Sequence, residues 1–436
     1  MISRRGFIAT AGLAGVATAV AGPVQAAPAG PQQALPPLNR PSGAPHEVAR
    51  DEAYWGRVAA YYQIGSGYTN LEAGYWGMMA APVLAQFHGH IDRVNRDNSY
   101  YARREYDRDL TAARERVARF VGAKPSEIAF TRGATEALQR LIIQYRPVGA
   151  GDAVIYADLD YSSMQTAMRA LAEQRGATLV RFDLPEPATR QGVLDSYAQI
   201  LERTSKARLL LLTHLNNKTG LIIPVKEIAA MARARGVDVV VDAAHSFGQC
   251  DLRLDDLGAD FVGLNLHKWL GAPVGAGLMY VKEGRLDDLD PMLGEEDNGR
   301  IDSRIHTGTT NFATFLSVPA ALDFHDAVGG PHKAARVRYL RDRWVGAVRG
   351  TRGIDVLTPD DAELVAAITS FRLHGRGGRT ENQAVVAELL DRWGIFTVWR
   401  TGVAAGDCVR VTPALYNTPA DVDQLAAALT ELAAAV

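Results

Sequence analysis

Short apolar segments that suit β-strands recur along this 436-residue chain, and a helical pattern follows most of them. Strands are predicted at residues 128–130, 153–156, 178–182, 209–212, 239–241, 261–264 and 277–281, and helices at 104–121, 136–145, 162–175, 193–204 and 225–235. Because these strands are apolar at nearly every position, both faces of their sheet must be covered. The pattern predicts an α/β fold with a mainly parallel sheet between layers of helices.

A smaller region is predicted after Gly329, Gly330 and Pro331. It contains a long helix at 332–348, strands near 366–373, 396–399 and 409–412, and a final helix at 418–433 that Thr418 caps. We therefore expect an α+β domain at residues 329–436, and an N-terminal segment plus a large domain at residues 46–328. Residues 27–45 are rich in Pro, Ala and Gly and suit a linker.

Residues 1–26 have the features of an export signal. Arg4 and Arg5 precede an apolar run rich in Ala and Gly, and the small Ala26 suits a cleavage site. The paired arginines favour the twin-arginine pathway, a general secretory signal is the alternative, and the run is short for a membrane span. We expect cleavage near Ala26 after contact with the twin-arginine export machinery, and a periplasmic or secreted protein.

Charge and cysteine content narrow the class of partner. The net charge of the chain is −2, and it becomes −4 when Arg4 and Arg5 leave with the signal. This near-neutral balance gives no electrostatic reason to expect nucleic acid or stable membrane association. No metal-ligand spacing is present in the sequence. The cysteines, Cys250 and Cys408, could pair in an exported protein, but a core of this size does not need a disulfide.

Two charged residues follow neighbouring apolar segments. Asp242 directly follows the strand at 239–241, and Lys268 comes soon after the strand at 261–264. This pair suits an enzyme that uses pyridoxal phosphate (PLP), in which a lysine forms a Schiff base and an acid keeps the pyridine nitrogen protonated. The alternative is that Asp242 caps a helix and Lys268 is a surface charge. The pair alone does not decide between them.

Other polar residues fall at the carboxyl ends of predicted strands, where open α/β sheets bind ligands. Gly133, Ala134 and Thr135 join a strand to a helix, and the free N–H groups of such a turn suit a phosphate, although an ordinary helix start has the same residues. Tyr161 suits stacking on the pyridine ring or a place in the core. Asn217 suits either a hydrogen bond to the 3′-oxygen of the pyridine or a position in a turn.

The order of these motifs resembles the class V branch of fold-type I PLP enzymes. The shared motifs are Gly-Ala-Thr-Glu at 133–136, Asp-Tyr at 160–161, Asn-Asn-Lys-Thr-Gly at 216–220, Asp-Ala-Ala-His at 242–245, His-Lys-Trp-Leu-Gly-Ala-Pro at 267–273 and Thr-Gly-Thr-Thr-Asn at 307–311. The segment 257–270 is most similar to isopenicillin N epimerase-like members. The resemblance covers roughly residues 65–435, and it implies PLP as the cofactor and a mainly parallel sheet of the seven-stranded type.

The resemblance also implies roles for individual cofactor-binding residues. Lys268 would form the Schiff base and move protons at the substrate α-carbon, Asp242 would pair with the pyridinium nitrogen, and Tyr161 would stack on the ring. The remaining residues would contact the 3′-oxygen side (His245 and Asn217) or the phosphate (Gly133, Ala134, Thr135, Asn265 and His267).

Two further roles concern the partner subunit and the substrate. Thr309 would reach the phosphate of a neighbouring subunit, which implies a homodimer. Arg410 would bind the carboxylate of a small amino substrate through two hydrogen bonds, with a surface arginine as the alternative, and Arg400 would bind a second anionic group. Glu72 and Trp76 are individual features of a segment that resembles the family's substrate side, and they either shape specificity or pack.

One departure from the family concerns the reaction. Cysteine desulfurases carry a nucleophilic cysteine in a loop of the C-terminal domain, but residues 400–407 contain none. We therefore expect that the protein is not a cysteine desulfurase. The expected reaction is epimerisation, or lyase or oxidative tailoring, at the α-amino carbon of an amino acid or peptide-like metabolite. Aminotransfer to a 2-oxo acid is an alternative, and a non-catalytic PLP-binding scaffold is another.

Overall fold

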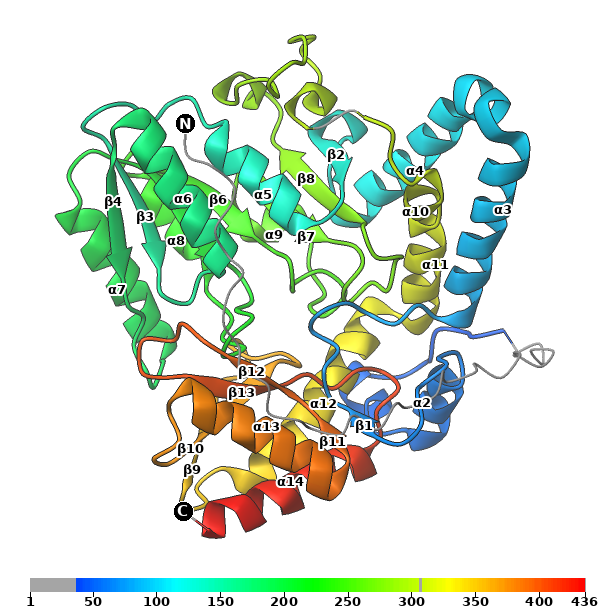
Figure 1. Cartoon of the computed structure of the whole chain (residues 1–436), viewed down its shortest axis with the longest axis vertical. Coiled ribbons are helices and arrows are strands. Elements are labelled where there is room, and N and C mark those ends of the chain that lie inside the picture. The colour runs from blue at the N-terminus through cyan, green and yellow to red at the C-terminus, as the bar shows by residue number, and fades with distance from the viewer. Residues whose placement is uncertain (1–36, 306–307, 436) are drawn as a thin grey trace, which may run out of the picture. The chain divides into compact units, whose positions relative to one another are not determined.

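The structure is a computed structural model that describes residues 37–305 and 308–435 (Figure 1). The predicted signal at residues 1–26 and the first part of the predicted linker lie outside these residues. Within the described ranges, Cys250 and Cys408 are free thiols. No helix in the same ranges is long and apolar enough to cross a membrane.

A seven-stranded sheet forms the centre of the large domain (Figure 1). Its spatial order is β2-β8-β7-β6-β5-β3-β4. The strands span Ile128–Thr131 (β2), Ala153–Ala157 (β3), Thr178–Phe182 (β4), Ala207–Thr213 (β5), Asp238–Asp242 (β6), Phe261–Asn265 (β7) and Gly277–Val281 (β8). All neighbours are parallel except β8, which is antiparallel to both β7 and β2. The predicted α/β class and mainly parallel sheet are therefore confirmed.

Two hydrophobic clusters cover the two faces of this sheet. Along β5, Leu209 and Leu211 belong to one cluster and Leu210 and Leu212 to the other, and all four are fully buried. The helices that supply these clusters and complete this region are α4 (Tyr106–Val121), α5 (Ala134–Ile143), α6 (Ser162–Arg175), α7 (Arg190–Arg203), α8 (Val225–Arg233) and the short α9 (Leu254–Leu257). Burial on both faces explains why the strands lack polar alternation.

Several helices lie outside the predicted pattern. They are α1 (Pro45–Val48), α2 (Glu52–Ala59), α3 (Ala81–Arg104), α10 (Phe312–Leu316) and α11 (Val318–Val328). The helix α3 buries only Val83 and Tyr101 among its 24 residues, so it carries a weak apolar stripe. Because α3 continues to Arg104, the predicted helix at 104–121 begins later, at Tyr106.

A smaller antiparallel sheet lies in the C-terminal part of the chain, in the order β12-β13-β10-β9. Its strands are β9 (Ile354–Val356), β10 (Thr369–Leu373), β12 (Val398–Arg400) and β13 (Cys408–Val411), and the helices of this part are α12 (Gly330–Val348), α13 (Arg379–Trp393) and α14 (Pro419–Ala434). As predicted, the Thr418 side chain caps α14, accepting a hydrogen bond from the N–H of Asp421.

The segment predicted as one strand at 396–399 is two strands. Ile395–Phe396 (β11) pairs in parallel with Thr69–Asn70 (β1), whereas β12 pairs antiparallel with β13. The two strands have different partners, so the chain changes sheet at Thr397. This pairing attaches the N-terminal residues 69–72 to the C-terminal domain, and a further parallel bridge joins Glu72 to Thr412.

Candidate active site

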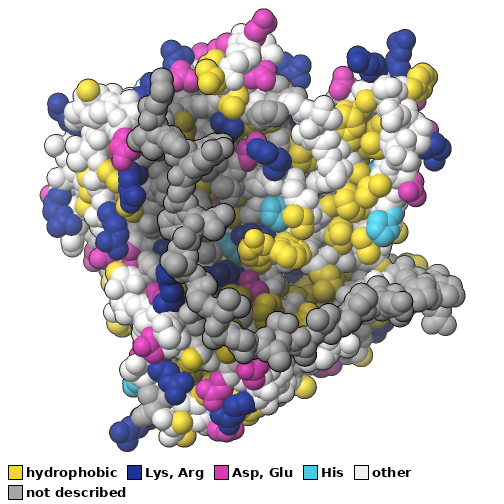
Figure 2. Space-filling view, in the orientation of Figure 1, with side chains coloured by type: hydrophobic (Ala, Val, Ile, Leu, Met, Phe, Trp, Pro, Cys, Tyr) yellow, Lys and Arg dark blue, Asp and Glu magenta, His cyan; other side chains and the backbone are white. Residues whose placement is uncertain are grey.

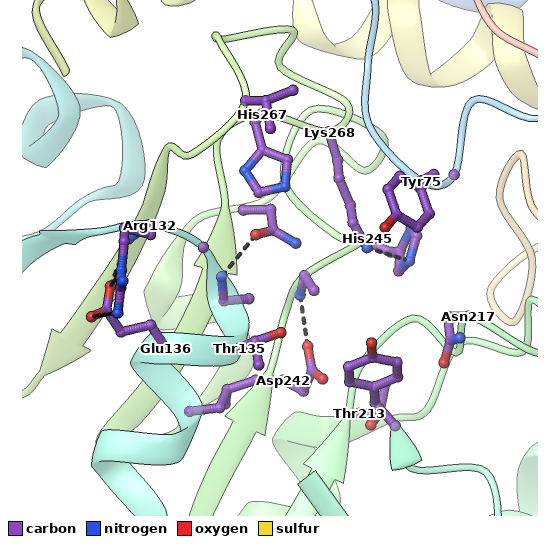
Figure 3. Close-up of a pocket in the computed structure, with 18 of the residues that line it drawn as sticks. Tyr75, Arg132, Thr135, Glu136, Thr213, Asn217, Asp242, His245, His267 and Lys268 are labelled. Atoms are coloured by element: carbon purple, nitrogen blue, oxygen red, sulfur yellow. Dashed lines mark hydrogen bonds and ion pairs between the residues drawn. The ribbon is translucent and has the colours of Figure 1, made fainter. Parts of the chain in front are cut away.

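The carboxyl ends of six strands lie at one edge of the large sheet, and a cavity of about 630 Å³ lies there. The lining side chains come from the ends of β2, β5, β6 and β7 and from the turn after β3 (Figure 3). The β2 strand shares this direction because two antiparallel pairings, through β8, relate it to β7. This is the edge at which open α/β sheets bind ligands.

Lys268 lies in the connection between β7 and the antiparallel β8. The connection is fixed from two sides, because the N–H of Gly77 donates to the carbonyl of His267 at 2.8 Å and the Lys333 ammonium donates to the carbonyl of Trp269. A Cβ atom on Gly77 would lie 1.8 Å from the carbonyl oxygen of Lys268, so only glycine fits there. The backbone that carries Lys268 is thus held close to the segment before α3.

His245 connects Lys268 to Trp269. The indole N–H of Trp269 donates to His245 Nδ1 at 3.2 Å, and His245 Nε2 lies 2.9 Å from Lys268 Nζ (Figure 3). Since Nδ1 accepts, the hydrogen of the neutral ring sits on Nε2. Nε2 then donates to Nζ, which requires the Lys268 side chain to accept as a neutral amine.

The electrostatics of the site agree with that assignment. Burial lowers the pKa of Lys268 to about 7, and the nearby Arg410 guanidinium adds to this effect while Asp242 opposes it. Burial also holds the pKa of His245 well below its usual range. An uncharged lysine next to an uncharged imidazole is the state that favours nucleophilic attack by the amine.

Asp242 lies at the floor of the cavity, at the end of β6 (Figure 3). It is 3% exposed, and its Oδ1 accepts a hydrogen bond from the N–H of Ala244 at 2.9 Å. Burial raises the pKa of Asp242 to about 6, whereas the Ala244 hydrogen bond and Lys268 lower it. A buried carboxylate of this kind is stabilised by a cation placed beside it.

The start of α5 forms the opposite end of the cavity. Gly133 is its N-cap, and the N–H of Ala134 donates to Asn265 Oδ1 at 2.7 Å, so this amide already has a partner. Thr135 lines the cavity in the first helical turn, where N–H groups point out of the helix. His267 Nδ1 donates to the carbonyl of Ala276 at 2.7 Å, so Nε2 of the neutral ring carries the lone pair and can accept a hydrogen bond. The remaining N–H groups at the start of α5 and the Thr135 hydroxyl suit an anion.

Arg410 and Arg400 line the cavity on the side of the C-terminal domain. Arg410 is 1% exposed, and its guanidinium donates to the carbonyl of Asn217 at 3.0 Å and to the carboxylate of Glu72. Arg400 Nη2 donates to the same carboxylate oxygen at 3.4 Å. Both arginines are therefore partly engaged by protein groups, and Asn217 presents its backbone to Arg410.

Most residues singled out in the sequence come together in this cavity. The lining includes Gly133, Ala134, Thr135, Tyr161, Asn217, Asp242, His245, Asn265, His267, Lys268, Arg400 and Arg410. Thr309 is not among the described lining residues of this chain; it lies just before α10. Its predicted contact is with a second subunit.

Two residues at the site, Trp269 and Thr213, were not assigned a role from the sequence, and Glu72 was expected either to shape specificity or to pack. Trp269 orients His245, Glu72 pairs with Arg410, and the Thr213 hydroxyl donates to the buried Asp160 at 2.7 Å beside the cavity. The position of Trp269 directly after Lys268 was an available signal. Glu72 was noted only as an individual feature, because its partner lies 338 positions away.

Comparison with known proteins identifies relatives over nearly the whole fold. The sequence profile of the aminotransferase class-V family matches residues 83–425. The isopenicillin N epimerase of Amycolatopsis lactamdurans is 30% identical over 408 residues, which are 87% of this chain and 98% of that protein. These matches confirm the resemblance inferred from the motifs.

Cysteine desulfurases are also similar to this chain. One from Yersinia pestis is 27% identical over 353 residues, covering 75% of this chain and 83% of that protein. The fold of a cysteine desulfurase from Escherichia coli superposes with a TM-score of 0.74 at 22% identity, covering 87% of this chain and 98% of that one. The fold-type I architecture is therefore confirmed.

The expectation that cysteine desulfurases are excluded was wrong. It rested on one loop without a cysteine at residues 400–407, whereas the similarity to cysteine desulfurases extends over three quarters of the chain. Cys408, the nearest cysteine, is a buried residue of β13, and burial raises the pKa of its thiol to about 11. A single loop position cannot separate branches that share the rest of the fold.

The cofactor that the family implies is PLP, and the residues present fit it. Asp242 is a buried carboxylate without a cationic hydrogen-bond partner among the described residues, which suits a protonated pyridine nitrogen. The Asn217 side-chain oxygen is buried and lacks a partner in the described chain. Lys268 and the start of α5 lie at different sides of the same cavity, as a ring aldehyde and a phosphate require.

Proposed function

Because the chain belongs to the aminotransferase class-V family, we propose that it is a PLP-dependent enzyme acting on the α-amino carbon of an amino acid or peptide-like metabolite outside the cytoplasm. The reaction we favour is epimerisation or a lyase or oxidative tailoring step. The observation that carries the proposal is the position of the Lys268 amine, 2.9 Å from His245 in a cavity shared with Asp242 and Arg410.

Bound PLP supplies an electron sink that stabilises negative charge at the substrate α-carbon. Asp242 would hold the pyridine nitrogen in its protonated form, because a buried carboxylate favours a neighbouring cation. The amine of Lys268, neutral in this environment, can accept a proton from the α-carbon and return it. His245 keeps Nζ oriented toward the cavity through the Nε2 hydrogen bond.

The two ends of the cavity orient the bound molecules. Thr135 and the free N–H groups at the start of α5 would hold the phosphate. Arg410, with Arg400 beside it, would hold the substrate carboxylate at the other end. Tyr161, which is 36% exposed and lines the cavity, would cover one face of the ring.

A homodimer is part of the proposal, with Thr309 of one subunit contacting the phosphate in the other. Exposed hydrophobic side chains on α3, including Ile91 and Tyr100, support a partner on this side. In Figure 2, hydrophobic side chains gather over the region of α3, α10 and α11. Light scattering of the purified protein tests this, and a monomer at micromolar concentration would contradict it.

The location outside the cytoplasm is supported by the N-terminal sequence with Arg4 and Arg5. Cell fractionation tests it together with an Arg4→Lys, Arg5→Lys variant, which we expect to remain in the cytoplasm. Finding the mature wild-type protein in the cytoplasm alone would remove this part of the proposal and leave the enzymatic part standing.

A second candidate reaction is cleavage of a carbon–sulfur bond in a cysteine-like substrate. The similarity to cysteine desulfurases favours it. Aminotransfer to a 2-oxo acid is the third. All three use the same lysine and acid and differ in the fate of the substrate after the α-proton leaves.

The visible absorbance of the holoenzyme, recorded with a panel of amino acids and peptidyl metabolites, tests the proposal. Epimerisation leaves the absorbance restored and inverts the configuration of the substrate, carbon–sulfur cleavage releases sulfur, and aminotransfer removes the absorbance until a 2-oxo acid is added. A protein that stays colourless when PLP is supplied would refute the enzymatic proposal. A coloured protein that responds to no amino compound would favour a PLP-binding scaffold.

A further inference from the structure

A carboxylate of the protein itself lies behind the two arginines that line the substrate end of the cavity. Glu72 accepts a hydrogen bond from the Arg410 guanidinium, and the same oxygen lies 3.4 Å from Arg400 Nη2. The side chain of Glu72 is 5% exposed and that of Arg410 is 1% exposed. This ion pair is therefore buried at the place where a substrate carboxylate is expected.

Glu72 is held in place by its backbone. Its N–H donates to Asn70 Oδ1 at 2.9 Å, and a parallel bridge joins it to Thr412. The one hydrogen of the Thr412 hydroxyl is shared between the Leu71 carbonyl at 3.0 Å and the second carboxylate oxygen of Glu72 at 3.3 Å. A Cβ atom on Gly74 would lie 2.6 Å from Arg410 Nη2, so the guanidinium packs directly on this segment. The carboxylate is therefore fixed directly behind the part of the cavity wall that Gly74, Arg400 and Arg410 form.

The three side chains do not balance in charge. Arg400 and Arg410 carry two positive charges, and Glu72 supplies one negative charge. Among the described residues, the Nε atoms of both arginines are buried and lack a hydrogen-bond partner. One positive charge is thus left for a ligand. A buried charge is stable only when it is paired, so the group binds one anionic charge well and a second one poorly.

Among the described residues that line the cavity, the mouth offers no arginine or lysine besides Arg400, Arg410, Lys268 and Arg132. It carries aromatic and aliphatic surface instead: Tyr75 is 67% exposed, Val274 is 61% exposed, and the Tyr75 ring packs against Trp76 at 4.8 Å. Arg132, also at the cavity, is already paired with Glu136. An uncharged substrate tail suits this surface.

We propose that Glu72 determines specificity by restricting the substrate to a single free carboxylate, so that the enzyme prefers α-amino monocarboxylates with an uncharged tail over dicarboxylates. This rests on the proposed function, in which the cavity binds an amino acid through Arg410. The discrimination arises from charge: Glu72 leaves one uncompensated positive charge on the two arginines, so a second ligand carboxylate finds no cation and is repelled by the fixed negative charge behind them.

Titration calorimetry of the holoenzyme with pentanoate and glutarate tests the proposal. Both ligands have five carbons and no amine, so neither reacts with the cofactor, and they differ by one carboxylate. We expect wild type to bind pentanoate more tightly, and Glu72→Gln to shift the ratio of dissociation constants toward glutarate by at least tenfold. Glu72→Asp keeps the charge and should retain the wild-type preference.

A matched control is Glu52→Gln, because Glu52 pairs with the buried Arg336 away from the cavity. It should leave the ratio unchanged. If Glu72→Gln does not fold, as judged by circular dichroism, Arg400→Gln replaces it: this variant removes the spare positive charge and should weaken pentanoate at least tenfold.

The remaining outcomes overturn the inference. If Glu72→Gln changes the dissociation constants of both ligands by the same factor, their ratio is unchanged and Glu72 does not discriminate by charge. If neither constant changes, Glu72 has a structural role only. An Arg400→Gln variant that binds pentanoate as tightly as wild type would also contradict the inference. In these cases the proposed function stands. If wild-type holoenzyme binds neither ligand, the carboxylate site of the proposed function fails, and the inference fails with it.

Discussion

The lowered pKa of Lys268 makes a quantitative prediction about cofactor capture. Only a neutral amine attacks an aldehyde, and burial with the nearby Arg410 lowers the pKa of Lys268 to about 7. At pH 7.5 about three quarters of such amines are neutral, against about one in a thousand for a lysine with its ordinary pKa near 10.5. The rate at which apoprotein captures PLP should therefore exceed that of an exposed lysine by nearly three orders of magnitude.

The sign of the pH dependence follows from the same argument. Capture should be slow at pH 5.5, where Nζ is protonated, rise through about pH 7 and be flat above about pH 8. Arg410→Met removes a cation that lowers the pKa of Lys268 and leaves Glu72 with Arg400 alone as its ion-pair partner, so the profile should move to higher pH. Glu52→Gln, which alters an ion pair away from the cavity, should keep the wild-type profile.

Stopped-flow absorbance after mixing apoprotein with PLP between pH 5.5 and 10 measures this rate. Lys268→Ala, which has no amine to react, gives the background, and N-acetyl-lysine methylamide gives the profile of an ordinary amine. A wild-type rate that keeps rising tenfold for each pH step up to pH 10 would refute the reasoning. So would an Arg410→Met profile that moves to lower pH.

Three further predictions concern the groups around Lys268. Gly77→Ala places a Cβ atom 1.8 Å from the Lys268 carbonyl oxygen, so we expect a folded protein with less than half the bound PLP per subunit, measured by absorbance after release in alkali. Asp242→Asn keeps the shape but loses the charge, and we expect turnover to fall by about 100-fold or more, as measured with whichever substrate the panel identifies. Trp269→Phe removes the donor to His245 Nδ1, and we expect the free energy of unfolding in urea to fall by about 1–3 kcal/mol. A fall of less than about 0.5 kcal/mol would contradict a buried hydrogen bond from Trp269 to His245.

The sheet and one edge of the site could be predicted because their signals are local in sequence. The strand at 209–212 is apolar at every position because both its faces are buried, and Asp242 directly follows the buried strand at 239–241. The carboxyl ends of parallel strands meet at one edge, so residues after different strands come together without further information. To predict that Lys268 also lies at this edge, one must know in addition that β8 runs antiparallel beside β7.

Other features depended on contacts between distant residues. The Glu72–Arg410 pair joins positions 338 apart, and no local pattern near Glu72 indicates an arginine. The change of sheet at Thr397 depends on pairing with β1, which is equally far away in the chain. The expectation that the protein is not a cysteine desulfurase was wrong for the opposite reason. It relied on the absence of a cysteine from one loop and gave less weight to the similarity of the whole chain.

The attachment of residues 69–72 to the C-terminal domain has a consequence for synthesis on the ribosome. Glu72 and its partner Thr412 are 340 positions apart, and translation at about 5–20 residues per second needs roughly 20 to 70 s to cover that distance. Leu71, fully buried in the finished protein, stays in solvent for that time. The side of the cavity that Gly74, Arg400 and Arg410 line is therefore among the last parts to form, and a chain released before residue 395 is made lacks the strand β11 with which its own β1 pairs.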